Sequence, residues 1–462
     1  MPTALGFIVQ KKEEERMFNF PKDFYSDVRI EHNYSSNIRI KEGRLEEIKE
    51  STNIGAFIRL FDGKKWYYTS TTDLKSIDKE LANLASFATP NPDINIHPVV
   101  LKFQKNTGDH CRFEDNNVKN ISLHDKLAVT KEYCKIVETD QEINSWSVQY
   151  FDFNKVKEFS SSIGCNIKFD TQNSGIFIIF RFGNGSDSFM EFSHESSPNF
   201  EDLKNKQNHA KERIEKARYF YKNAQTIPGG DYTVVLSPTV AGIFAHESFG
   251  HKSEADHMLG DEEMIKEWEL GKIVGSEKLS IYDDGNIIGS GYTPFDDEGN
   301  RACKTTLIEK GILKGRLHNA ETAAALNEEV TGNARALDFE NIPIVRMTST
   351  YIDKDPNMTK EELIKGVKYG IFIDTCKHGT GSSTFTIAPS MAYLIEDGKI
   401  TKPVKFSVIT GNVMKTLNEI DAVSNEIQIE KPAGGGCGKR AQFPLPVGHG
   451  GPYVRIKKIN VQ

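Results

Sequence analysis

A helix-breaking segment near the middle of the chain, Ile227-Pro228-Gly229-Gly230, most strongly limits how this sequence can fold. It follows a long and highly charged helical stretch from Glu201 to Gln225, which a proline and two glycines would end. Because segments of this kind often separate domains, we place a boundary here, between residues 1–227 and 228–462. The length of 462 residues is compatible with two or three domains.

The hydrophobic pattern differs between the two parts. In the first, apolar residues alternate in Asp27–Glu31 and Asn37–Lys41, as in half-buried strands, whereas Leu74–Phe87 and the segment after Ser122 have a helical period. In the second part, glycine-rich turns separate many short β-like runs. The predicted fold class is α+β: an N-terminal two-layer domain of helices on a sheet, then a mostly antiparallel β domain that carries one informative helix.

The overall charge and hydropathy exclude several kinds of partner. With 58 Lys and Arg against 65 Asp and Glu, the net charge is −7, so we expect no nucleic-acid partner. The longest nearly apolar run, Val234–Ala245, is far shorter than the ~20 residues that span a bilayer. The N-terminus, MPTALGFIVQKKEEERM, has no basic residues before its short apolar stretch and is unlike a signal peptide. We therefore expect a soluble cytoplasmic protein without membrane contact.

The informative helix carries residues that are typical of a metal site. A short apolar strand leads into Ser237, a good helix N-cap, and Pro238 occupies the favoured first helical position. The helix then presents His246, Glu247 and His251. Neutral imidazoles bind zinc, and a neighbouring carboxylate can take a proton from metal-bound water, as in zinc hydrolases. The alternative is a pair of unrelated histidines.

The spacing of the two histidines predicts an irregular helix. The pattern HExxxH is one residue longer than the usual zincin motif. At about 100° per residue, side chains at i and i+4 lie roughly 40° apart, but those at i and i+5 lie roughly 140° apart. For both rings to face one metal, the helix must therefore widen locally or break at Gly250.

A catalytic zinc usually has three protein ligands and one open position, so a third ligand is expected. The candidates are three nearby residues, one distant cysteine and an acidic run: Glu254, Asp256, His257, Cys437 and Asp296-Asp297-Glu298. The six cysteines form no CxxC pair, and neighbouring glycines would leave the thiolate of Cys437 reachable; a buried structural cysteine is the alternative. The acidic run is more typical of a hairpin turn than of a calcium loop, and His449 is more typical of a loop histidine than of an additional ligand or hydrogen-bond donor.

Several segments together resemble the TldD/PmbA family of metalloproteases. The segments are His246-Glu247-Ser248-Phe249-Gly250-His251, Asp283-Asp284-Gly285, Gly332-Asn333-Ala334-Arg335, Gly436-Cys437-Gly438-Lys439 and, in the first part, Arg39-x-x-Glu42-Gly43-Arg44 followed by Gly55-x-x-x-Arg59. The resemblance extends over nearly the whole chain. Because the HExxxH motif is complete, the chain resembles the TldD type and not its motif-less PmbA/TldE-type relatives.

The resemblance implies a zinc-dependent peptidase that hydrolyses small or unstructured peptides bound in extended conformation. It implies that zinc is bound by His246, His251 and Cys437, with Glu247 activating zinc-bound water. It also implies a homodimer, or a heterodimer with a motif-less PmbA/TldE-type subunit, with the N-terminal domain contributing to the substrate cleft and the dimer contacts. The alternative is a non-catalytic peptide-binding or regulatory modulator with a structural metal, but such a site has no use for Glu247.

Overall fold

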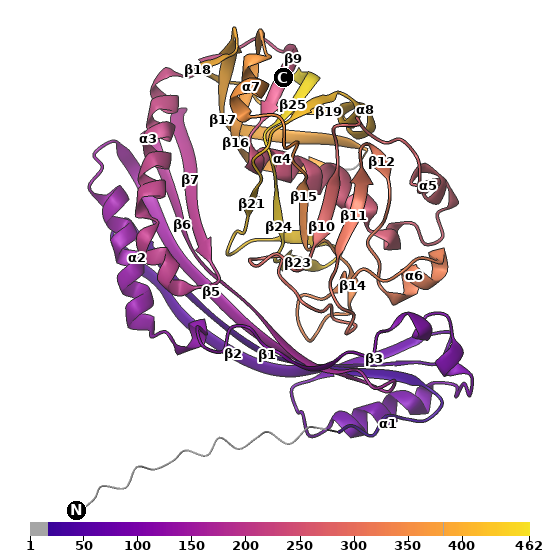
Figure 1. The fold of residues 1–462 in the computed structure, drawn as a ribbon. Helices are drawn as coiled ribbons and strands as arrows, with labels where there is room; N and C mark the ends of the chain where they lie inside the picture. The colour runs from indigo at the N-terminus through magenta and orange to yellow at the C-terminus, as the bar shows by residue number, and fades with distance from the viewer. Residues whose placement is uncertain (1–16, 382) are drawn as a thin grey trace, which may run out of the picture.

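The computed structural model describes residues 17–381 and 383–462 and has an α+β fold, as predicted (Figure 1). A long curved sheet forms the N-terminal half, and the C-terminal half lies inside its curve. The N-terminal segment in which we find no signal peptide falls almost wholly outside the described residues. Among the described residues, every helix is too short or too polar to cross a bilayer.

The N-terminal sheet has the strand order β3-β2-β1-β5-β6-β4, and β7 also pairs with β6. Its strands are β1 (Tyr25–Lys41), β2 (Arg44–Phe61), β3 (Trp66–Thr71), β4 (Thr107–His110), β5 (Ile143–Ser161), β6 (Asn166–Asn184) and β7 (Asp187–Ser197). The α-helices are α1 (Ile77–Phe87), α2 (Leu123–Glu138) and α3 (Gln207–Asn223). Figure 1 shows α2 and α3 on the outer face of the curved sheet, where their apolar sides pack on β5 and β6.

A fully buried lysine joins α2 to the sheet. Lys126 Nζ lies 2.7 Å from Asp152 Oδ2 and donates to Tyr34 Oη at 2.8 Å and to Ser36 Oγ at 3.1 Å. Both charged side chains have no exposed surface, so each depends on the other for compensation of its charge.

We expect Lys126→Met to destabilise the N-terminal half by about 3–5 kcal/mol, because the carboxylate of Asp152 would remain buried without its counter-ion. Urea unfolding followed by circular dichroism measures this loss. The control is Lys135→Met, in which an exposed lysine loses an exposed i,i+3 partner, Glu132; its effect should be below about 1 kcal/mol. Equal stability of the two variants would contradict the prediction.

The C-terminal half contains an eight-stranded sheet, a six-stranded sheet and two small hairpins. The eight-stranded sheet comprises β8 (Gln225–Thr226), β9 (Gly230–Leu236), β16 (Tyr369–Gly381), β17 (Thr384–Glu396), β18 (Lys399–Lys405), β19 (Ile409–Asn412), β20 (Ile420–Val423) and β25 (Val454–Val461). The six-stranded sheet comprises β10 (Ile281–Asp284), β11 (Lys304–Glu309), β12 (Ile312–Leu313), β15 (Ser349–Ile352), β21 (Gln428–Glu430) and β24 (Gly448–Gly451). Most strand pairs are antiparallel; the exceptions in this half are β9–β16, β8–β18 and β15–β24.

The remaining elements of this half are short. They include the hairpin strands β13 (Ala334–Arg335), β14 (Ile344–Val345), β22 (Cys437–Lys439) and β23 (Gln442–Leu445), and the α-helices α4 (Pro238–Ala245), α5 (Glu262–Glu267), α6 (Ala320–Leu326), α7 (Lys360–Lys365) and α8 (Val413–Asn418). Helix α4 packs between β16 and the strands β15, β21 and β24. A Cβ atom at Gly242 would overlap the backbone of Gly450, so glycine is what allows this close approach.

The acidic run forms a tight turn, as predicted, but this turn is buried against the N-terminal sheet. A bridge between Phe295 and Arg301 closes it. Asp297 Oδ1 lies 2.5 Å from Lys157 Nζ, and Glu298 Oε1 lies 3.0 Å from Arg59 Nη1. These carboxylates therefore neutralise cations of the N-terminal half, and within the described ranges no candidate metal group includes them.

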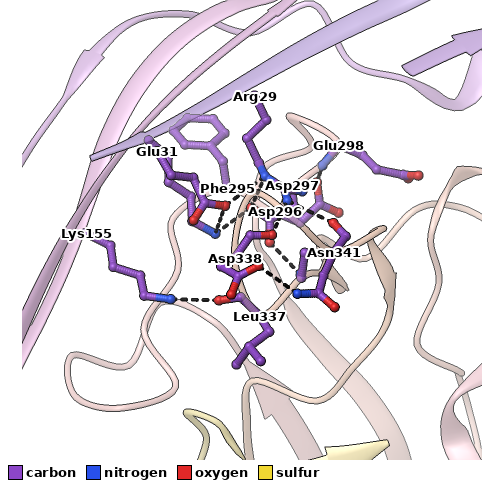
Figure 2. A network of polar contacts seen from close by, with 12 residues as sticks. Arg29, Glu31, Lys155, Phe295, Asp296, Asp297, Glu298, Leu337, Asp338 and Asn341 are labelled. Atoms are coloured by element: carbon purple, nitrogen blue, oxygen red, sulfur yellow. Dashed lines mark hydrogen bonds and ion pairs between the residues drawn. The ribbon is translucent and has the colours of Figure 1, made fainter. Parts of the chain in front are cut away.

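A second set of contacts surrounds this turn (Figure 2). Arg29 Nη2 donates to the carbonyl oxygen of Asp338 at 2.8 Å, and Lys155 Nζ donates to that of Leu337 at 2.7 Å. Figure 2 shows Arg29 and Glu31 on the sheet facing Asp297. Charged groups therefore connect the two halves of the molecule.

Candidate metal centre

The strand–helix segment folds as its sequence predicts. Ser237 caps α4 through its hydroxyl, which accepts a hydrogen bond from the N–H of Val240, and Pro238 is the first helical residue. The α-helix ends at Ala245 and continues as a π-helical turn over His246–Gly250, in which the N–H of His251 donates to the carbonyl of His246. The predicted widening is therefore confirmed. It brings the two imidazoles together, with ring centroids 5.1 Å apart.

The β22–β23 hairpin brings the third residue, Cys437, to the same place. Its Sγ lies 3.3 Å from Nε2 of His251, although the two residues are separated by 186 positions in sequence. One potential ligand atom from each of His246, His251 and Cys437 lies within 4.8 Å of the other two. The structure thus places the three predicted ligands around one point.

Glu254, which we considered as a third ligand, lies on the other side of the His251 ring. Its Oε2 accepts a hydrogen bond from His251 Nδ1 at 3.0 Å, while Nε2 of the same ring faces Cys437. A carboxylate in this position holds a ligating histidine in one tautomer and orientation. Burial would raise the pKa of Glu254, but the hydrogen bonds from His251 and His257 and the charge of Lys439 hold it well below its usual range.

The other candidate ligands have different roles. Asp256 forms an ion pair with Lys439, with 2.5 Å between Oδ1 and Nζ. The exposed side chain of His257 places its Nε2 3.5 Å from Glu254 Oε2. We expected His449 to lie in a loop. It lies instead in the strand β24, which pairs with β15 and β21. The expectation was wrong because its glycine neighbours, typical of a loop, here permit close packing of the strand against α4.

The three ligand candidates include one imidazole that burial keeps neutral. Burial, assisted by the nearby His251 and His449, holds the pKa of His246 well below its usual value, and His246 Nδ1 has no hydrogen-bond partner among the described residues. For His251, burial acts in the same direction, but the hydrogen bonds to Cys437 and Glu254 raise its pKa to about 10. Two imidazoles and one thiolate form a donor set that fits zinc, and one of the imidazole nitrogens, His246 Nδ1, has no other partner among the described residues.

Glu247 lies beside the three ligand candidates, and its carboxylate has no structural partner among the described residues. It is half-buried under β16, where a Cβ atom at Gly379 would touch its Cγ. Among the residues that the structure describes, no hydrogen bond or ion pair engages its carboxylate. Burial raises the pKa of Glu247, although the charge of His251 opposes this shift. A free, partly desolvated carboxylate next to a candidate metal site is suited to accept a proton.

Family models of known proteins match both halves of the chain. A family model described as PmbA/TldA metallopeptidase C-terminal domain matches residues 229–462, and one described as PmbA/TldA metallopeptidase domain 1 matches residues 26–88. The first of these ranges includes all the residues of the candidate site.

Similar proteins carry corresponding names. A metalloprotease of Methanocaldococcus jannaschii is 32% identical over 441 residues, which cover 93% of this chain and 95% of that protein. A protein of Saccharolobus solfataricus named zinc metalloprotease TldD homolog is 28% identical, with 98% of each chain covered. The chain belongs to the TldD/PmbA metallopeptidase family.

Solved structures share the fold. A Thermotoga maritima protein, described as a suspected modulator of a DNA gyrase, matches with a TM-score of 0.77 at 21% identity, covering 95% of this chain and 96% of that one. TldE from Thermococcus kodakarensis matches with a TM-score of 0.73 at 16% identity, with the same coverage. At these identities the comparison concerns the fold alone.

Two residues near the site received no role in the sequence analysis. Lys439 belongs to the Cys437 hairpin and forms an ion pair with Glu254, and Arg346 Nη2 donates to the carbonyl of Cys437 at 2.7 Å. The sequence held a signal for Lys439, because residues two apart in a strand lie on one face, and Lys439 therefore lies on the same face as Cys437. For Arg346, which lies 91 positions away, no local signal was present.

Proposed function

We propose that this chain is a zinc-dependent peptidase that hydrolyses small or unstructured peptides. The observation that carries the proposal is the convergence of His246, His251 and Cys437 beside a carboxylate that has no structural partner. A structural zinc site normally has four protein ligands and needs no free base. A site with three ligands and a nearby Glu247 is the arrangement that hydrolysis requires.

Each residue of the proposed zinc site would have a separate role. His246, His251 and Cys437 would hold the zinc, and Glu254 would keep the His251 ring oriented through Nδ1. Bound zinc would supply a Lewis acid that polarises a carbonyl oxygen and makes water nucleophilic near neutral pH. Glu247 would accept the proton of the attacking water and return it to the leaving amine.

The proposal includes the form of the substrate and the assembly. A peptide in extended conformation can be held mainly by its main chain along a sheet edge, which gives little dependence on side chains. We further propose a homodimer, or a heterodimer with a motif-less PmbA/TldE-type subunit. Size-exclusion chromatography with light scattering, alone and with such a subunit, distinguishes these assemblies.

Removal of the metal tests the proposal. The purified protein should contain about one zinc per chain, measured by plasma mass spectrometry, and should cleave an unstructured fluorogenic peptide. A chelator should abolish cleavage, and stoichiometric zinc should restore it, since the Lewis acid is required for the reaction. Cleavage that persists after complete loss of zinc would contradict the proposal. If the zinc-loaded protein binds peptides without cleaving them, alone or with a motif-less relative, the modulator alternative is favoured.

A further inference from the structure

The cysteine of the metal site lies on a hairpin with few regular contacts of its own. Within residues 17–381 and 383–462 the β22–β23 hairpin pairs with no other strand, and the segment before it contains Gly434, Gly435 and Gly436, all with positive φ. Such a segment loses much conformational freedom on folding. Specific side-chain contacts must therefore hold Cys437 near His251.

Lys439 supplies such a contact from within the hairpin. Its Nζ lies 3.0 Å from Glu254 Oε2 and 2.5 Å from Asp256 Oδ1, and it donates to the carbonyl of Val345 at 2.9 Å. Three oxygen atoms therefore surround the ammonium group, and two of them accept hydrogen bonds from it. The side chain is 5% exposed, so solvent screens these interactions very little.

The same carboxylate oxygen serves both Lys439 and a ligand candidate. Glu254 Oε2 accepts a hydrogen bond from His251 Nδ1 and forms an ion pair with Lys439 Nζ, and Glu254 is fully buried. Lys439 is thus connected to Cys437 through two residues of backbone and to His251 through one shared carboxylate. Without its charge, the carboxylates of Glu254 and Asp256 would face each other with less compensation.

We propose that Lys439 is a positioning residue that joins the Cys437 hairpin to the His251–Glu254 segment and thereby determines how tightly the site retains its metal. The inference rests on the proposed zinc site. Lys439 does not itself ligate the metal, because its ammonium group is held by the two carboxylates and by the carbonyl of Val345. Its effect is exerted on the spacing of Cys437 and His251 and on the orientation of the His251 ring.

The test is the zinc affinity of Lys439→Met, measured by competition with a chromophoric chelator on the full-length protein. Loss of a residue that orients ligands typically weakens metal binding about 10–100-fold, and we expect a loss in this range. The matched control is Lys126→Met, which removes an equally buried lysine that is paired with Asp152 in the N-terminal half. The control should lose stability and keep the wild-type zinc affinity.

A spectroscopic measurement separates positioning from general destabilisation. In the cobalt-substituted protein, the thiolate-to-metal absorption band reports the Cys437 bond, and it should shift or weaken in Lys439→Met but not in Lys126→Met. If Lys439→Met does not fold, Asp256→Asn provides the second variant, since it keeps the side-chain volume, removes a carboxylate that holds Lys439 and leaves the Glu254–His251 hydrogen bond in place; unchanged zinc affinity in this variant would count against the proposal.

The possible outcomes are distinct. Wild-type zinc affinity and an unchanged cobalt spectrum in Lys439→Met would overturn this inference alone and leave the proposed function intact. Equal loss of affinity in Lys439→Met and Lys126→Met would also overturn it, because the effect would then be one of overall stability. If the wild-type protein binds no zinc, the proposed function and this inference are both wrong.

Discussion

Glu247→Gln is expected to lower the rate of peptide hydrolysis at least about 10²–10⁴-fold while leaving the zinc content near one per chain. The substitution keeps the shape of the side chain and removes the group that accepts the proton. Glu247 makes no hydrogen bond or ion pair with another described residue, so its replacement should not cost a structural contact. The measurement is kcat/KM for an unstructured fluorogenic peptide, together with the zinc content of the same preparation.

Two further measurements make this result decisive. The thermal unfolding midpoint of Glu247→Gln should equal or slightly exceed that of the wild type, because burial disfavours the charged carboxylate and raises the pKa of Glu247. A large fall in the midpoint would reveal a structural role. Cleavage at the wild-type rate by a zinc-loaded Glu247→Gln protein would falsify the proposed mechanism.

Substitution of each ligand candidate should remove most of the bound zinc. We expect His246→Ala, His251→Ala and Cys437→Ser to reduce the zinc content well below one per chain after gel filtration and to abolish hydrolysis. The reason is that two protein ligands hold zinc far less firmly than three. The readouts are plasma mass spectrometry and the peptide assay.

The control for these variants is Cys376→Ser, which replaces another buried cysteine outside the candidate metal group. It should retain zinc. Full zinc content in Cys437→Ser would exclude Cys437 as a ligand. Glu254, which touches His251 through the opposite ring nitrogen, would then be the residue to test next.

The prediction of the helix geometry succeeded because it depends on local factors. The cap at Ser237, the proline at 238 and the spacing of His246 and His251 restrict a single continuous segment. The angle per residue of an α-helix is fixed by its hydrogen bonds, so a five-residue spacing required a wider turn or a break. The π-helical turn is the first of these two solutions.

The roles of the polar residues were less accessible from sequence. The run Asp296-Asp297-Glu298 was expected to form a turn, and it does, but its pairing with Lys157 and Arg59 could not be foreseen. Burial of a charge depends on which cations another part of the chain brings to it. Those cations lie 140 and 239 positions away in sequence.

The sequence by itself determined the α+β class, the start of the metal-site helix, its irregular turn and, through resemblance, the family. Only the tertiary structure decided that Cys437 lies against His251, that Glu254 orients the ring from behind, and that Lys439 connects the two. Helix caps and periodicity act between residues a few positions apart, and their signals are therefore visible in a short stretch of sequence. Contacts across 186 positions depend instead on how the sheets and hairpins of the whole C-terminal half pack together.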